Sequence, residues 1–146
     1  MEISALIVDD SGIMRKMVMR ALRETDLANF VFTEAQDGVD ALEKFDPEKI
    51  NMIFVDWNMP NMNGIDFVKK VRSEQKRHIP VVMVTTESTV GKVEEALNEA
   101  RVDCFIVKPF TPEVLEKKLE PLFTKIAAAA KKKSDGFFGK IAKSLS

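Results

Sequence analysis

Short apolar runs alternate with segments of helical period along this chain of 146 residues. Most of these runs are nearly continuous, as in strands that are covered on both faces. We therefore expect one domain in which five βα units build a parallel sheet flanked by helices. The expected strands span residues 3–8, 30–35, 52–55, 81–84 and 104–107. Residues 30–35 alternate more between apolar and polar side chains, which favours a less buried edge.

The segments between these runs carry apolar side chains at helical spacing. Two stripes predict amphipathic helices: Met14, Met17, Val18, Ala21 and Leu22, and later Val90, Val93, Leu97 and Ala100. Further helices are expected over residues 39–45 and 65–74. The methionine-rich stripe could be a soft binding face, but core packing is the more common use of such residues.

The last helix has a strong start signal, because Thr111 suits the N-cap and Pro112 suits the first helical position. One face carries Leu115, Leu119, Leu122 and Ile126. Pro121 removes a backbone hydrogen bond, which costs about 3 kcal/mol in an undistorted helix, so we expect a kink or a break there. The sequence Ser-Asp-Gly at residues 134–136 predicts a stop.

Charge is distributed unevenly along the chain. The net charge is -1, but residues 125–146 hold six Lys and one Asp, a net charge of +5. The remaining 16 basic and 22 acidic residues give the rest of the chain a net charge of -6. We therefore expect a domain at residues 1–124 and a basic helical extension at residues 125–146. An acidic domain argues against nucleic acid as the main partner, because phosphate backbones require a dense Lys and Arg surface.

Three further features bear on the compartment and on metal chemistry. The single cysteine, Cys104, cannot form an internal disulfide and lies in an apolar run, so a small buried thiol is expected. The first residues carry no basic leader and no apolar run long enough for a membrane span, which favours a cytoplasmic protein. The single histidine, His78, lies in a charged connector and is expected to be a solvated surface residue.

Acidic residues stand at the carboxyl ends of two expected strands. Asp9 and Asp10 follow the first strand, and Asp56 follows the third. Ligands of open α/β sheets bind at this edge. Two carboxylates about 4 Å apart repel by about 4 kcal/mol at an effective dielectric near 20, so three of them favour a bound cation. An all-oxygen set with room for water and phosphate is typical of Mg²⁺.

Residues that handle phosphate follow two more strands. Thr85 ends the fourth strand and Lys108 follows the fifth, where they could offer a hydroxyl and a point cation to a phosphoryl group on Asp56. Attack by a carboxylate on phosphorus gives an acyl phosphate, a labile species that suits a signal that must decay.

Four motifs of the chain resemble the receiver domains of response regulators, and among them the chemotaxis members. They are Val-Asp-Asp-Ser (8–11), Asp-Trp-Asn-Met-Pro-Asn-Met-Asn-Gly (56–64), Val-Thr-Thr-Glu (84–87) and Val-Lys-Pro-Phe (107–110). The likeness covers residues 3–123. It implies a flavodoxin-like (βα)₅ fold, a doubly wound sheet with strand order 2-1-3-4-5, here followed by the C-terminal helical extension.

The resemblance also implies a role for each motif residue. Asp56 would be the phosphoacceptor, and Asp9, Asp10, Asp56 and the backbone carbonyl of Asn58 would bind Mg²⁺. Thr85 would be the switch hydroxyl and Lys108 the phosphate-binding lysine, with a cis peptide before Pro109. Asn58 and Glu87 match positions that tune dephosphorylation.

Two residues depart from the pattern of this family. Phe105 stands where the chemotaxis members have a switch tyrosine, so its ring can still move inward but offers no hydroxyl to the output surface. Thr86 replaces a smaller residue, and its β-branched side chain would narrow the approach to the phosphoryl group.

The resemblance implies a single-domain regulator that catalyses only its own phosphorylation and dephosphorylation. Its partners would be a sensor histidine kinase and a flagellar switch or other downstream protein. An alternative is a phosphorelay intermediate or phosphate sink that passes phosphoryl groups to a histidine phosphotransfer protein. An aspartyl phosphohydrolase is disfavoured, because such enzymes usually need a second Asp where this chain has Asn58.

The last residues predict a short basic amphipathic helix. Phe137, Ile141 and Leu145 recur every four residues, while Lys140 and Lys143 lie toward the other side. Such a short helix is marginal in water unless it packs on a surface. A frayed end, docking on an acidic protein surface and contact with an anionic membrane all remain open. Opposite charges favour docking on this chain's own domain or on that of a neighbouring copy.

Overall fold

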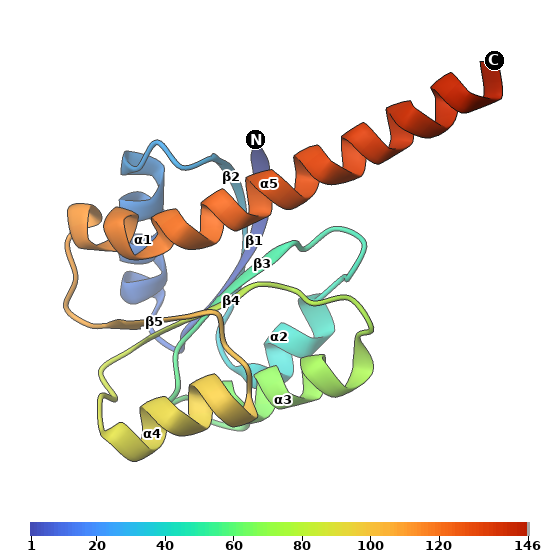
Figure 1. Ribbon diagram of the computed structural model, residues 1–146. Coiled ribbons are helices and arrows are strands. Elements are labelled where there is room, and N and C mark those ends of the chain that lie inside the picture. The colour runs from blue at the N-terminus through green and yellow to red at the C-terminus, as the bar shows by residue number, and fades with distance from the viewer. Residues whose placement is uncertain (146) are drawn as a thin grey trace.

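The computed structural model describes the backbone of residues 1–145 and the side chains of residues 1–136. Its core is one parallel sheet with the strand order β2-β1-β3-β4-β5, flanked by helices on both faces (Figure 1). The strands are β1 (Glu2–Val8), β2 (Asn29–Ala35), β3 (Met52–Val55), β4 (Val81–Thr85) and β5 (Cys104–Val107). The flavodoxin-like fold and its strand order are therefore confirmed, and each predicted strand agrees within one residue at either end.

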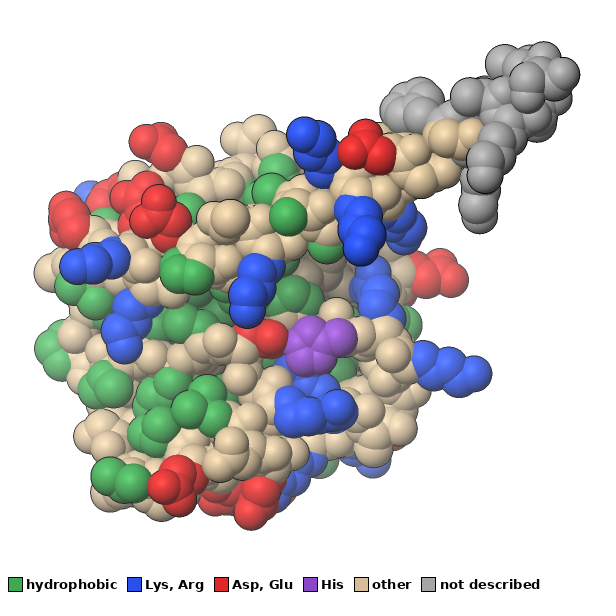
Figure 2. All heavy atoms as spheres, in the orientation of Figure 1, with side chains coloured by type: hydrophobic (Ala, Val, Ile, Leu, Met, Phe, Trp, Pro, Cys, Tyr) green, Lys and Arg blue, Asp and Glu red, His purple; other side chains and the backbone are tan. Residues whose placement is uncertain are grey.

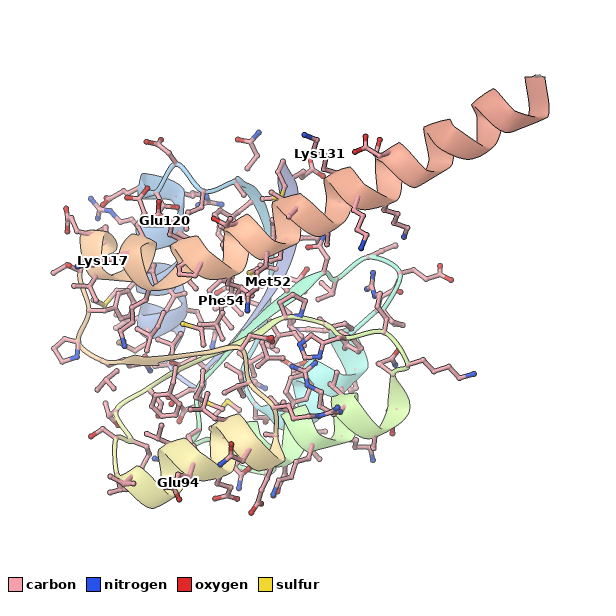
Figure 3. All side chains as sticks on the ribbon, in the orientation of Figure 1. Met52, Phe54, Glu94, Lys117, Glu120 and Lys131 are labelled. Carbon is pink, nitrogen blue, oxygen red and sulfur yellow. The ribbon has the colours of Figure 1, made fainter. Side chains whose placement is uncertain are left out.

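Helices cover both faces of this sheet. They are α1 (Gly12–Glu24), α2 (Gly38–Lys44), α3 (Gly64–Glu74), α4 (Val90–Glu94), the π-helical turn η1 (Glu95–Glu99) and α5 (Pro112–Leu145). Figure 1 shows α1 and α5 on one face and α2, α3 and α4 on the other. The two faces bury separate cores: Phe54 and Met52 point toward α5 (Figure 3), whereas Ile53 and Val55 pack with α3.

Side-chain caps start α1, α2, α3 and α5, whereas α4 has no side-chain cap hydrogen bond. Ser11, Asp37 and Asn63 accept hydrogen bonds from backbone N–H groups three residues later, at 3.2, 2.8 and 2.8 Å. Thr111 caps α5 in the same way, at 3.2 Å from the N–H of Val114, as predicted. These caps satisfy free N–H groups at the helix starts and fix where each loop ends.

The two predicted apolar stripes are only partly buried, which corrects the sequence analysis. In α1, Met17 is 53% exposed and Met19 is buried in its place. After β4, Ala96 and Ala100 are buried, whereas Val90 is 74% exposed and Leu97 is 43% exposed. The π turn η1 has a wider period than an α-helix, so a spacing rule based on 3.6 residues per turn points to the wrong side chains.

Helix α5 differs from its prediction in two places. It continues through Pro121 without a break and through residues 134–136 without the predicted stop. Pro121 is exposed, and Leu119 and Phe123 on either side are buried against the sheet, which holds the helix direction across the lost hydrogen bond. The apolar residues predicted to line its end, Phe137 to Leu145, lie outside the described side chains. No helix within the described residues is long and apolar enough to cross a membrane.

Both edge strands are less buried than the central three. The alternating pattern of β2 agrees with its predicted edge position. Strand β5 forms the other edge, so Cys104 is half-buried rather than fully buried, and Val107 is 40% exposed. His78 is half-exposed, as predicted, with its Nε2 2.8 Å from Asp103 Oδ1.

Candidate functional site

Three carboxylates meet at the carboxyl edge of the sheet. Strands β1 and β3 are neighbours, with Val8 opposite Val55, so the residues that follow them are brought together. Oxygen atoms of Asp9, Asp10 and Asp56 all lie within 4.8 Å of one another. Asp9 is buried, Asp56 is half-buried and Asp10 is exposed. The sequence analysis predicted this cluster from the strand ends alone.

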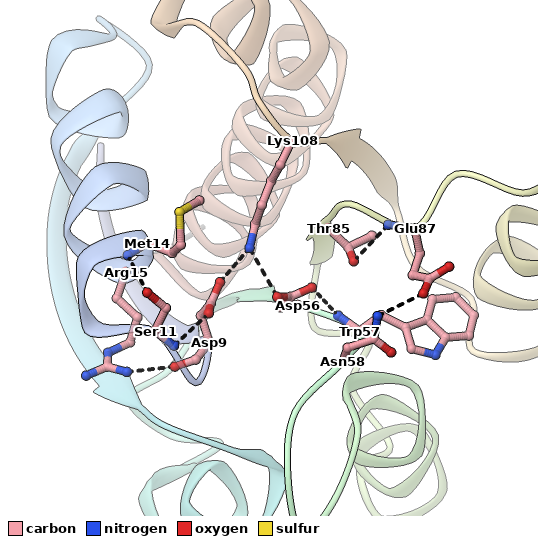
Figure 4. Close-up of polar contacts among 10 residues, drawn as sticks. All are labelled: Asp9, Ser11, Met14, Arg15, Asp56, Trp57, Asn58, Thr85, Glu87 and Lys108. Carbon is pink, nitrogen blue, oxygen red and sulfur yellow. Dashed lines mark hydrogen bonds and ion pairs between the residues drawn. The ribbon is translucent and has the colours of Figure 1, made fainter.

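Lys108 reaches this cluster from the loop after β5. Its Nζ lies 2.7 Å from Asp9 Oδ2 and 3.1 Å from Asp56 Oδ2 (Figure 4). Burial alone would lower the pKa of Lys108, but hydrogen bonds to the two carboxylates and their negative charge outweigh burial, so the pKa lies above its ordinary value. One ammonium therefore compensates part of the charge of three carboxylates.

Backbone N–H groups donate hydrogen bonds to the second carboxylate oxygens of Asp9 and Asp56. Asp9 Oδ1 accepts from the N–H of Ser11 at 2.9 Å, and Asp56 Oδ1 accepts from the N–H of Trp57 at 2.7 Å. Three carboxylates against one lysine leave excess negative charge on oxygen donors. This donor set fits Mg²⁺, which prefers carboxylate and water ligands.

Thr85, Asn58 and Glu87 lie beside the acidic cluster. The Asn58 side chain donates a hydrogen bond to Glu87 Oε1 at 2.8 Å, and the Thr85 hydroxyl accepts from the Glu87 N–H at 3.3 Å. Thr85 is fully buried, and its carbonyl accepts from the N–H of Lys108 at 2.9 Å. Asn58 and Glu87 thus contact each other, and the Thr85 hydroxyl accepts its hydrogen bond from the loop after β4.

Phe105 lies on β5, opposite Met83 of β4. It is half-buried and packs against the core on the α3 side of the sheet. The peptide before Pro109 is cis, as the family resemblance implied. Thr86 is exposed and lines a shallow apolar pocket with Met14 and Lys108. Each predicted site residue is therefore at this edge or on the adjoining strand.

Three supporting contacts were missed by the sequence analysis. Arg15 donates to the backbone carbonyl of Asp9 at 2.6 Å and to Glu34 Oε1 at 3.0 Å. A Cβ at Gly64 would overlap the backbone carbonyl of Asp56. The Lys92 ammonium lies 4.6 Å from the centre of the Trp57 ring, a cation–π contact. Only Gly64 had a signal in the sequence, as the last residue of the motif that begins at Asp56.

A parallel sheet of this order, with clustered carboxylates and a lysine at its carboxyl edge, defines a receiver-type domain. The chain belongs to the response regulator receiver domain family, whose model matches residues 5–120. The end of α5 lies beyond that match.

Several curated relatives of this chain are named as chemotaxis proteins. The chain is 46% identical to CheY1 of Helicobacter pylori over 117 residues, which cover 79% of this chain and 92% of that protein. It is 39% identical to CheY of Pseudomonas aeruginosa over 122 residues, covering 83% and 96%. The structure of the chemotaxis response regulator CheY4 of Vibrio cholerae matches with a TM-score of 0.72 at 37% identity, covering 83% of this chain and 98% of that one.

Proposed function

We propose that this chain is a single-domain response regulator in which Asp56 accepts a phosphoryl group and thereby switches a protein-binding surface. The observation that carries the proposal is the cluster of Asp9, Asp10 and Asp56 with Lys108 between two of its members. Such a cluster supplies a nucleophile, a cation and an oxygen-rich metal site within one small region.

The transfer follows from the positions of these groups. An oxygen of Asp56 forms a bond to phosphorus while the bond between phosphorus and a donor histidine nitrogen breaks, and that nitrogen takes up a proton from water. Lys108, already 3.1 Å from Asp56 Oδ2, neutralises charge on the transferred group. The three carboxylates and the Asn58 carbonyl would hold Mg²⁺, which would neutralise the remaining phosphoryl charge.

The proposed switch depends on which group forms a hydrogen bond with the Thr85 hydroxyl. Its hydroxyl now accepts from the N–H of Glu87, and a phosphoryl group on Asp56 would draw it away. The half-buried ring of Phe105 would then move into the vacated space, a shift between two existing states. Thr85→Ala should leave phosphorylation intact and remove the linked change at Phe105 in NMR spectra.

The biological setting comes from the relatives, whose names place them in chemotaxis. We infer that the donor is a sensor histidine kinase and that the output partner is a flagellar switch or another downstream protein. The chain would turn over no external substrate. A role as a phosphorelay intermediate or phosphate sink would instead require transfer of the phosphoryl group back to a histidine phosphotransfer protein.

The decisive experiment is labelling with acetyl phosphate or a phosphorylated kinase. We expect one phosphoryl group per chain, only with Mg²⁺ present, and a change in Trp57 fluorescence on metal binding and on phosphorylation. Asp56→Asn should abolish labelling, whereas Asp135→Asn, at an exposed position on α5, should label normally. Full labelling of Asp56→Asn would refute the assignment, and efficient reverse transfer would favour the relay role.

A further inference from the structure

The end of α5 extends away from the rest of the molecule. Among the residues with described side chains, Phe123 is the last buried one of α5, and residues 127–136 are all exposed. At 1.5 Å per residue, the segment from residue 127 to residue 145 is about 28 Å long. Figure 1 shows it projecting beyond the sheet. A helix of this length gains little stability in water on its own, so a surface that packs against it would stabilise it.

We call residues 125–145 the basic helix. Its described part exposes Lys125, Lys131, Lys132 and Lys133, and Figure 3 shows Lys131 on the projecting part. The sequence then adds four large apolar residues and two further lysines within nine positions. A partner must therefore offer both apolar area and negative charge.

One face of the domain offers both. We define the α4–α5 face by the exposed apolar residues Val90 of α4, Leu97 of η1, Val107 of β5 and Val114 of α5, which are 74%, 43%, 40% and 45% exposed. Figure 2 shows hydrophobic side chains gathered between α4 and α5, with acidic side chains along α4. Glu94, at the edge of this face (Figure 3), is exposed, whereas Glu99 pairs with Lys69 of α3 at 3.2 Å on the other side of η1.

We propose that the basic helix of one molecule docks on the α4–α5 face of a second molecule. The continuous helix carries the basic segment away from its own domain. Pairing between two basic helices is opposed by a net charge of +5 on each tail (six Lys, one Asp), whereas the rest of each chain has a net charge of -6 (16 basic, 22 acidic). The exposed apolar residues of the face and Glu94 at its edge therefore fit the basic helix of a neighbour.

This contact has a structural consequence. Each molecule offers one helix and one face, so two molecules can pair reciprocally or add further copies head to tail. The helix covers β5, the strand that carries Phe105, so association and binding of an output protein compete. The contact needs neither Mg²⁺ nor phosphorylation, and it can be tested without either.

The first test is sedimentation of the full chain at low salt, without Mg²⁺ or phosphodonor. We expect the average mass to rise with concentration and to fall when salt is added, because salt screens the charges. Reversing Lys131, Lys132 and Lys133 to Glu together should weaken association about tenfold or more. A matched control reverses Lys16, Lys49 and Lys76, which are also exposed, and should change association much less.

The second test reverses the receiving face. Glu94→Lys should weaken self-association, and circular dichroism should show an unchanged fold. Mixing this variant with the tail-reversed variant should restore association, because each supplies the opposite charge to the other.

Three results would overturn the proposal. The first is a wild-type chain that stays monomeric at all concentrations. The second is an equal effect of the tail reversal and the control reversal on association. The third is a mixture of the two reversed variants that fails to associate. If a monomeric wild-type chain binds phosphatidylglycerol vesicles and the tail-reversed variant does not, the basic helix contacts membranes instead.

Discussion

At the residue scale, Gly64 is the tightest constraint on the backbone at Asp56, the proposed phosphoacceptor. A Cβ at this position would overlap the backbone carbonyl of Asp56, and a backbone atom cannot rotate away. Gly64→Ala should therefore destabilise the protein by about 2 kcal/mol or more and weaken Mg²⁺ binding. Urea unfolding and Trp57 fluorescence titration measure the two effects.

Gly91 provides the matched control for this substitution. It lies in α4, and a Cβ there would meet nothing within 4 Å. Gly91→Ala should stabilise the protein by about 0.5 to 1 kcal/mol, because alanine favours the helix. Equal effects of the two substitutions would contradict the steric role of Gly64.

Asp37 gives a residue-scale prediction on pH. The backbone N–H of Asp40 and the side chain of Asn61 donate to its carboxylate and lower its pKa, although burial opposes them. A pKa that is lower in the folded state stabilises the fold above the unfolded value near 3.9 and loses that contribution as the pH falls through the folded value. Asp37→Asn should therefore lose stability at pH 7 and show a weaker fall in acid. A melting series from neutral to acid pH tests this, and parallel curves for the two proteins would refute it.

The site residues themselves were largely predictable from sequence. Asp9, Asp10, Asp56 and Lys108 all follow strands, and parallel strands bring their carboxyl ends to one edge. The residues that hold the site residues in position were not predictable in the same way. Arg15 contacts the carbonyl of Asp9 only because α1 leans on that edge, and no spacing in the sequence encodes that distance.

At the element scale, Pro121 in α5 allows the destabilising effect of a proline inside a long helix to be measured. Pro121→Ala should restore a backbone hydrogen bond and raise the free energy of unfolding by about 1 to 3 kcal/mol. Pro112→Ala is the control, because the first helical position needs no such bond and should give no gain. Chemical denaturation measures both, and an equal gain from both would refute the assignment of the cost to Pro121.

The helices and strands also show where the spacing of apolar residues in the sequence predicts structure correctly and where it does not. Central strands and the start of α5 were predicted well, because continuous apolar runs and capping residues act locally. The buried face of the helix after β4 was not predicted well. Ala96 and Ala100 are buried against α3 and β5 through the wider turn η1, and tertiary packing rather than local sequence decides that turn. The length of α5 was also missed, since Ser-Asp-Gly is a weak stop when alanines and lysines precede it.

At the scale of the whole molecule, magnesium binding should couple to folding. A ligand that binds only the folded state stabilises it by about 1.4 kcal/mol when its concentration is tenfold above its dissociation constant. Mg²⁺ should therefore raise the melting temperature by a few degrees, and Asp10→Asn should largely remove that gain. Asp26→Asn, outside the acidic cluster, should keep it. An unchanged gain in Asp10→Asn would place the ion elsewhere.

The position of Lys108 between Asp9 and Asp56 has a consequence for how a cell could use this protein. Because an internal cation already offsets part of the carboxylate repulsion, we expect the chain to stay folded without the metal. Magnesium would then limit the rate of the reaction rather than the supply of folded protein. A fall in free Mg²⁺ would slow the signal at once, and restoring the ion would bring the signal back without new synthesis.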